Sequence, residues 1–363
     1  MEKPRDNAAS SDSRLSRRGF LKAAAATAAV AGVGGLLAAC SAPATAPAGT
    51  TAPAAPKGKI TIKFGHVLAA TEPIQKAWED AAARIKQRTN GDVEVQVFPA
   101  GQLGGDRDMA EQSRLGANIV NLIAFGYMSE YVKDFNAFSL PFLFTDWEKE
   151  GKKIFTSPLM NDLGDRYLKQ GGMVLLASTY FFGERHIAST KPINKPDDMK
   201  GLKIRIPPID MWRELFVTAL GAAGTPLEWA EVYPALQSGT IDAAEAPYSS
   251  IKGSKLHEVA KNVAATGHFT QVNAVHVGYK YWDTLPKDVQ TVVKEEILTA
   301  GDAYAKAQLE SAAKDREALI KEGAKVVDVD RKAFQDKSKV VYDKFEPTFT
   351  KGLLDQIYKL RGG

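Results

Sequence analysis

Residues 59–98 read KITIKFGHVLAATEPIQKAWEDAAARIKQRTNGDVEVQVF, and this stretch decides the fold. Its first part, 59–65, alternates polar and apolar side chains and ends in glycine, which is typical of a strand. Residues 73–89 place apolar side chains on one helix face and stop at an Asn-Gly pair. Residues 93–97 alternate again and predict a second strand.

The same order continues along the chain. Residues 104–115 predict a helix and 119–124 a short apolar strand. A strand–helix–strand–helix–strand order indicates an α/β domain with a largely parallel sheet. Further strands are expected at 173–177, 203–206 and 326–329, and further helices at 215–220 and 334–345.

The longest uninterrupted helical segment runs from Pro286 to Glu322 and stops at Gly323. Unbroken, it would span roughly 55 Å, more than one small domain. A helix of that length can belong to two domains. The alternative is two helices with a bend near Gly301.

The N-terminus has the parts of an export signal. Adjacent arginines stand in Ser16-Arg-Arg-Gly-Phe-Leu-Lys22, and the uncharged apolar run 23–39 follows. A basic region, an apolar region and small residues at a cleavage site indicate export, here of the twin-arginine type. Cys40 comes directly after Leu-Ala-Ala, as in a bacterial lipobox, so we expect residues 1–39 to be removed and Cys40 to be lipidated. Residues 41–57, rich in Ala, Pro and Thr, predict a flexible tether.

Two structural alternatives stand beside this interpretation. The apolar run could be a transmembrane anchor, although it is short and rich in Ala and Gly for a bilayer core that needs about 20 apolar residues. The only cysteine could be a buried core thiol. With export, the chain is expected in the periplasm, tethered by lipid to the outer face of the cytoplasmic membrane.

Composition limits the function classes. About 305 residues remain after residue 57, enough for two domains of ordinary size. The first 40 residues hold six of the 47 Lys and Arg and three of the 43 Asp and Glu, which leaves 41 against 40. A nearly neutral mature chain does not favour nucleic-acid binding, which needs a clustered basic face.

Sequence signatures of enzymes are mostly absent. The region after residue 57 has no nucleophile elbow, phosphate loop or dinucleotide fingerprint. His257-Glu258-Val-Ala-Lys261 misses the zinc-helix pattern, because lysine stands where the second histidine is needed. We therefore expect no metal, no cofactor and a binding protein rather than an enzyme.

Two arginines are candidates for binding an anion. Arg205 lies near the carboxyl end of an apolar strand and is followed by two prolines, and Arg185 stands twenty residues earlier. Ligands bind at that edge of open α/β sheets, and a guanidinium grips a carboxylate with two parallel hydrogen bonds. The structural alternative is that Arg205 merely pairs with a neighbouring acid.

Six segments in order resemble the substrate-binding subunit of tripartite ATP-independent periplasmic (TRAP) transporters. The segments are FPAGQLG at 98–104, LPFLF at 140–144, GLKIRIP at 201–207, EVYPALQSG at 231–239, IDAAEAP at 241–247 and WDTLP at 282–286. Each is weak alone, but the likeness covers nearly all of the mature chain.

The resemblance implies roles for particular residues. Arg205 matches the family arginine that pairs with the substrate carboxylate, Arg185 a second arginine that assists it, and Trp229 an aromatic position that packs against the ligand. Ala246 departs from the family, because many relatives have Asn there, so the polar pattern of the ligand should differ. Further pocket candidates near strand ends and motif loops, each with a structural role as the alternative, are His66, Gln102, Tyr127 and Tyr248.

Aromatic side chains indicate a bulkier or more apolar acid, although most of them could belong to the core. They are Tyr180, Phe181, Phe182, Trp212 and Trp229.

The resemblance also implies the architecture and the partners. We expect an α/β two-domain clamshell with the long helix bridging both domains. Domain I is placed at 58–182 plus 272–311, and domain II at 183–271 plus 312–363. The cargo would be a small organic acid, passed to the small and large membrane subunits of a permease driven by an ion gradient, without an ATPase. The alternatives are an ABC-importer binding protein, an exported lyase or hydrolase acting on an acid, and a sensor partner.

Overall fold

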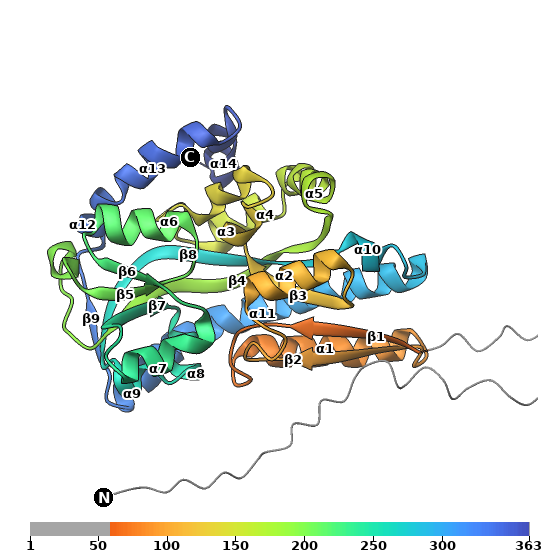
Figure 1. Ribbon diagram of the computed structural model, residues 1–363, viewed down its shortest axis with the longest axis horizontal. Coiled ribbons are helices and arrows are strands. Elements are labelled where there is room, and N and C mark those ends of the chain that lie inside the picture. The colour runs from red at the N-terminus through yellow and green to blue at the C-terminus, as the bar shows by residue number, and fades with distance from the viewer. Residues whose placement is uncertain (1–58, 363) are drawn as a thin grey trace, which may run out of the picture. The chain divides into compact units, whose positions relative to one another are not determined.

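A computed structural model of the protein describes residues 59–362, and Figure 1 shows their arrangement. The predictions for the export signal, Cys40 and the tether fall on residues outside this range. The strands are β1 (Ile60–Gly65), β2 (Val93–Phe98), β3 (Ile119–Ala124), β4 (Met173–Ser189), β5 (Lys203–Ile206), β6 (Ala223–Pro226), β7 (Ala243–Ala246), β8 (Asn262–Gly278) and β9 (Lys325–Asp328). The α-helices are α1 (Pro73–Arg88), α2 (Asp106–Leu115), α3 (Phe125–Met128), α4 (Lys152–Phe155), α5 (Pro158–Gly171), α6 (Asp210–Arg213), α7 (Val232–Gln237), α8 (Tyr248–Gly253), α9 (Leu256–Val259), α10 (Tyr279–Trp282), α11 (Lys287–Lys321), α12 (Arg331–Lys337), α13 (Lys339–Phe345) and α14 (Leu353–Arg361). Short 3-10 or π segments are η1 (Lys133–Ser139), η2 (Trp147–Gly151), η3 (Pro196–Met199), η4 (Glu214–Ala219), η5 (Trp229–Glu231) and η6 (Glu346–Thr348).

The N-terminal strand–helix order is confirmed. Strand β1 pairs in parallel with both β2 and β3, and α1 and α2 connect them. The apolar face of α1, which includes Ile74, Trp78 and Ile85, is buried in a core shared with these strands and α11. Glu72, the residue before α1, is buried and accepts a hydrogen bond from the Ser250 hydroxyl of α8.

Two 17-residue strands, β4 and β8, run antiparallel to each other through the middle of the sheet. The strand order is β2-β1-β3-β8-β4-β7-β5-β6, with β9 pairing β8. The sheet is therefore mixed. The pairs β5–β6, β5–β7 and β8–β9 are parallel like those of the first three strands, whereas β3–β8, β4–β8 and β4–β7 are antiparallel, which the sequence did not predict. Strand β4 shifts register at Gly183, whose φ of +116° suits glycine.

The long helix α11 is continuous over 35 residues, about 52 Å at the usual rise. It packs on the central strand β4, on α1 beside β1 and β2, and on α8, which follows β7 (Figure 1). Gly301 marks no bend: a Cβ there would meet the Tyr180 ring at 2.9 Å, so the glycine allows the helix to approach β4 closely.

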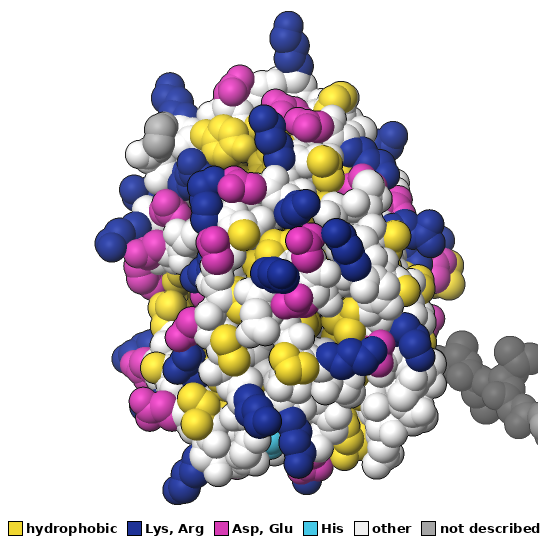
Figure 2. All heavy atoms as spheres, turned by 90° about the vertical axis from the view of Figure 1, so that its left-hand side faces the viewer, with side chains coloured by type: hydrophobic (Ala, Val, Ile, Leu, Met, Phe, Trp, Pro, Cys, Tyr) yellow, Lys and Arg dark blue, Asp and Glu magenta, His cyan; other side chains and the backbone are white. Residues whose placement is uncertain are grey.

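The C-terminal part departs further from the sequence expectation. The helix expected over 334–345 is interrupted at Ser338 between α12 and α13, and α14 was not foreseen. Residues of α13 and α14 close a second core around α3, α5 and η1. Among residues 59–362, no helix is long and apolar enough to cross a membrane. Figure 2 shows acidic and basic side chains interspersed over one face, without a block of one sign on that face.

Candidate functional site

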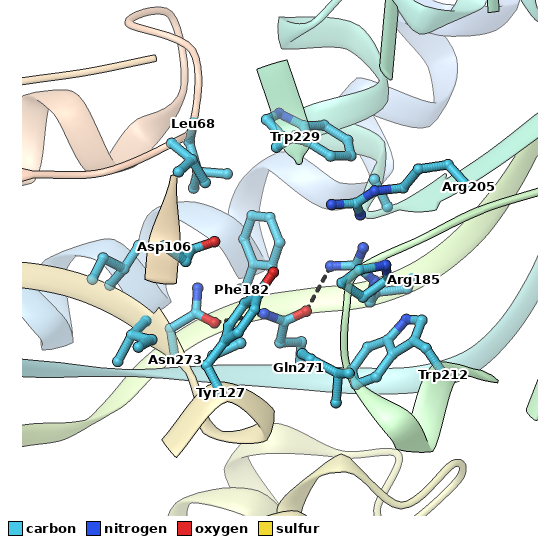
Figure 3. Close-up of a pocket in the computed structure, with 17 residues that line it drawn as sticks. Leu68, Asp106, Tyr127, Phe182, Arg185, Arg205, Trp212, Trp229, Gln271 and Asn273 are labelled. Atoms are coloured by element: carbon cyan, nitrogen blue, oxygen red, sulfur yellow. Dashed lines mark hydrogen bonds between the residues drawn. The ribbon is translucent and has the colours of Figure 1, made fainter. Parts of the chain in front are cut away.

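A cavity of about 60 Å³ is lined by residues of β3, β4, β5, β7 and β8 and of the helices and loops next to them (Figure 3). One wall comes from the segment after β1, the start of α2, and the β3–α3 junction, and the opposite wall from β5, α6, η5 and β7. The floor is formed by the central strands β4 and β8. The lining residues are Val67, Leu68, Asp106, Leu122, Ile123, Ala124, Tyr127, Phe182, Arg185, Arg205, Pro207, Ile209, Trp212, Trp229, Ala246, Gln271 and Asn273.

Arg205, the third residue of β5, projects its guanidinium into this cavity (Figure 3). Its side chain is buried, and its Nε donates to the Leu227 carbonyl at 2.9 Å. The guanidinium carbon lies 5.4 Å from the centre of the Trp229 ring. Within residues 59–362, no carboxylate lies within salt-bridge distance of Arg205, and no acceptor faces its two Nη groups. Burial lowers the pKa of Arg205, but a guanidinium remains charged at any ordinary pH.

Arg185 lies in the same cavity but is already paired. It forms a salt bridge with the buried carboxylate of Glu245 on β7, with Nη2 2.7 Å from Oε1. Burial alone would raise the pKa of Glu245, yet the charge of Arg185 holds that pKa at about 2. The two arginines therefore differ: Arg185 has a salt-bridge partner in the protein, whereas Arg205 has acidic groups only at longer range.

The wall opposite Arg205 carries three polar groups. Asp106, the first residue of α2, is partly buried, and burial together with the nearby Glu228 raises its pKa to about 7. Tyr127 points its hydroxyl into the cavity, and burial raises its pKa, so the phenol stays protonated (Figure 3). Asn273, on the floor strand β8, lies beside these two side chains and completes the polar group (Figure 3).

The structure brings together four of the seven predicted ligand residues: Arg205, Arg185, Trp229 and Tyr127 all line the cavity. Ala246 lines it too and offers no polar side chain.

The other three candidates lie elsewhere. His66 is buried beneath the site, bonded to Gln75 at 3.1 Å, and burial lowers its pKa to about 4. Gln102 is exposed in the turn before α2. Tyr248 stacks on His186 with ring centres 4.0 Å apart and lines a separate cavity beside α11.

Sequence reasoning missed Asp106, Gln271, Asn273 and Glu245. Asp106 has a usable signal, because it follows directly on the glycine-rich 98–104 motif. Glu245 lies inside the 241–247 motif, but nothing in that motif shows that its carboxylate meets Arg185. Gln271 and Asn273 lie in a segment without a motif, and only strand pairing brings them to the cavity.

A catalytic centre does not emerge from the described residues. In residues 59–362, no group of three or more His, Cys, Asp or Glu side chains could hold a metal ion. The aromatic walls, the unpaired cation and the three polar groups form a site that can bind a small anion and orient it.

Comparisons with known proteins agree with this description. Residues 64–348 match the family described as bacterial extracellular solute-binding protein, family 7. A C4-dicarboxylate-binding periplasmic protein of Rhodobacter capsulatus is 33% identical over 248 residues, covering 67% of this chain and 72% of that protein.

Two solved structures are similar over most of the chain. The TRAP periplasmic solute-binding protein of Ochrobacterium anthropi, with bound L-fuconate, is 31% identical with a TM-score of 0.80, covering 84% of this chain and 100% of that one. That of Actinobacillus succinogenes 130Z, with bound L-galactonate, is 28% identical with a TM-score of 0.79, covering 83% and 99%.

The fold is that of a two-domain clamshell binding protein of the α/β class. The chain belongs to family 7 of the bacterial extracellular solute-binding proteins, and the resemblance to TRAP solute-binding subunits is confirmed.

Proposed function

We propose that this protein captures a small organic acid outside the cytoplasm and delivers it, chemically unaltered, to a TRAP-type permease. The observation that carries the proposal is the buried guanidinium of Arg205, whose two Nη groups face the cavity without an acceptor in the described residues. A buried charge without a partner is costly, so the site calls for an anion from outside. A carboxylate fits best, because it accepts two parallel bonds from a guanidinium.

The other side chains around the cavity indicate which groups the rest of the solute carries. Asp106, Tyr127 and Asn273 offer hydrogen-bond donors and acceptors there, whereas Phe182, Trp212 and Trp229 give apolar faces. Hydroxyl groups both donate and accept, so they suit this mixture. We therefore propose a hydroxylated monocarboxylate, of the chemical kind bound by the two solved relatives.

We also propose the domain division 58–182 plus 272–311 and 183–271 plus 312–363. Support comes from the cavity, which takes Tyr127 and Asn273 from the first part and Arg205 and Trp229 from the second. Hinge closure of the two parts around the solute would bury its carboxylate against Arg205.

The route to the membrane completes the proposal. The twin-arginine signal would export the folded chain, and lipid on Cys40 would hold it at the outer face of the cytoplasmic membrane. There it would meet a small and a large permease subunit driven by an ion gradient.

Mass spectrometry of solute released from the purified mature protein tests the proposal most directly. We expect a small carboxylic acid, recovered unaltered after incubation with the protein. A thermal-shift panel of hydroxy acids, dicarboxylates and phosphate esters should then show the largest stabilisation with hydroxy monocarboxylates. If no acid raises the melting temperature, or if the bound acid is converted to product, the proposal is wrong.

A further inference from the structure

A chain of hydrogen bonds leads from Glu245 through Arg185 to the polar wall of the cavity. Arg185 Nη2 bonds the Glu245 side chain at 2.7 Å and its backbone carbonyl at 2.6 Å. Arg185 Nη1 donates to Gln271 Oε1 at 2.6 Å, and Gln271 Nε2 donates to Asn273 Oδ1 at 2.6 Å. Gln271 and Asn273 lie two residues apart on β8, so their side chains share one face of the sheet.

The direction of these bonds is set by Arg185. An amide side chain has nearly the same shape when its oxygen and nitrogen are exchanged, so its neighbours decide its orientation. A guanidinium can only donate, and Gln271 must therefore offer it the oxygen. That leaves the Gln271 nitrogen facing Asn273, which must in turn accept through its own oxygen.

The amide nitrogen of Asn273 is therefore a hydrogen-bond donor at the cavity. With Oδ1 of Asn273 engaged, its Nδ2 faces the cavity on the side of Asp106 (Figure 3). Among the described residues, no side chain or carbonyl accepts a bond from Nδ2. Asn273 as a whole is only 4% exposed, so its amide is held in place at the cavity lining, where a solute can reach Nδ2.

We propose that Asn273 is a specificity-determining residue that donates to an oxygen acceptor on the bound solute, and that Arg185 is a positioning residue that fixes this polarity through Gln271. The inference rests on the proposed function for the existence of an acid solute. It changes the role expected for Arg185, which acts through two amides and not by gripping the carboxylate. A hydroxyl on the solute fits here, because it can accept from Asn273 while donating to Asp106.

Gln271→Glu tests the relay with little risk to folding. A glutamate still accepts from Arg185 but cannot donate, so the Asn273 amide should turn over and present its oxygen to the cavity. Asn273→Ala removes the donor altogether. Gln335→Glu on the exposed face of α12 makes the same charge change away from the site and serves as the control.

Calorimetry with L-galactonate and L-fuconate gives the first readout. Loss of one neutral hydrogen bond costs about 0.5–1.5 kcal/mol, so each variant should bind roughly 3- to 12-fold more weakly. The double variant Gln271→Glu/Asn273→Ala should be no weaker than Asn273→Ala, because both changes remove the same bond. Additive losses, or unchanged binding by Asn273→Ala, would overturn the inference.

Side-chain amide exchange, followed by NMR in the ligand-free protein, gives a readout that needs no solute. The Asn273 amide protons should exchange at least about tenfold faster than those of Gln271, because only the latter are bonded within the protein. In Gln271→Glu, the Asn273 protons should become protected. Protected Asn273 protons in the unmodified protein would refute the relay even if an acid binds. If the exchange result holds and no acid binds, the proposed function fails alone.

Discussion

Replacing Arg205 by alanine should abolish most of the affinity for the acid and leave the fold intact. In the unmodified protein, the solute carboxylate would accept hydrogen bonds from both Nη groups of Arg205, which form no other hydrogen bond within residues 59–362. Truncating one member of a buried, hydrogen-bonded charge pair costs about 2–5 kcal/mol. We expect the lower half of this range, because the space left by the guanidinium admits water to the carboxylate. That corresponds to roughly a hundredfold weaker binding.

Titration calorimetry of the acid recovered from the protein measures the loss. Arg205→Lys keeps the charge but offers no planar pair of donors, so an intermediate loss of about tenfold is expected. Arg213→Ala, which removes an exposed arginine of α6, should bind normally. The ligand-free melting temperature of Arg205→Ala should not fall, because the change removes an uncompensated buried charge. Binding by Arg205→Ala within threefold of the unmodified protein would refute the assigned role.

Other substitutions probe the site and its surroundings. Trp229→Ala should weaken acid binding by roughly 5- to 30-fold in calorimetry, since a desolvated cation–π contact is worth about 1–2 kcal/mol. An unchanged affinity would exclude the ring from recognition. A solute anion should raise the pKa of Asp106 further above about 7. The affinity for the acid should therefore increase as the pH falls from 8 to 6. In Asp106→Asn, the affinity should depend much less on pH over this range. Burial raises the pKa of Glu72 from 4.5 to about 7, so the stability linked to its proton is complete below pH 4.5 and is lost as the pH rises through 7. Glu72→Gln should therefore melt a few degrees higher than the unmodified protein at pH 8 but not at pH 4.5, in calorimetric scans at both pH values. Cys40→Ala should release the protein from the membrane fraction in cell fractionation, and retention there would contradict lipid attachment.

The sequence was sufficient for the parts of the fold with local signals. Strands β1 to β3 alternate or are short apolar runs, and glycine ends the helices between them, so the N-terminal unit was predicted almost to the residue. Strand β8 gave no such signal. Its segment NVAATGHFTQVNAVHVG is buried nearly throughout although it contains many polar side chains, so neither alternation nor a continuous apolar run marks it.

Prediction from local sequence patterns also fails for the two arginines of the site. Arg185 and Arg205 look alike in the sequence, each close to apolar residues, although only Arg205 stands on an expected strand. Their difference depends on Glu245, which reaches Arg185 because β7 pairs with β4 at Ile187 and Glu245. That pairing joins residues about sixty positions apart, and no local pattern encodes it. Asp106 could have been predicted, because the glycine-rich turn before α2 places the start of this helix at the cavity.

The contrast between the two arginines also explains why binding and closure would belong together. Arg185 carries its own counter-charge, so its burial costs little whether or not a solute is present. Arg205 has no salt-bridge partner among the described residues, and enclosing it in an empty cavity is unfavourable unless water reaches it. Opening of the cleft would let water solvate the guanidinium of Arg205. A bound anion would replace that water as the partner of the guanidinium. The solute therefore stabilises the closed form more than the open one, which is the differential affinity that any ligand needs in order to shift a conformational equilibrium. A neutral solute of the same shape lacks this difference and would occupy the site without closing it.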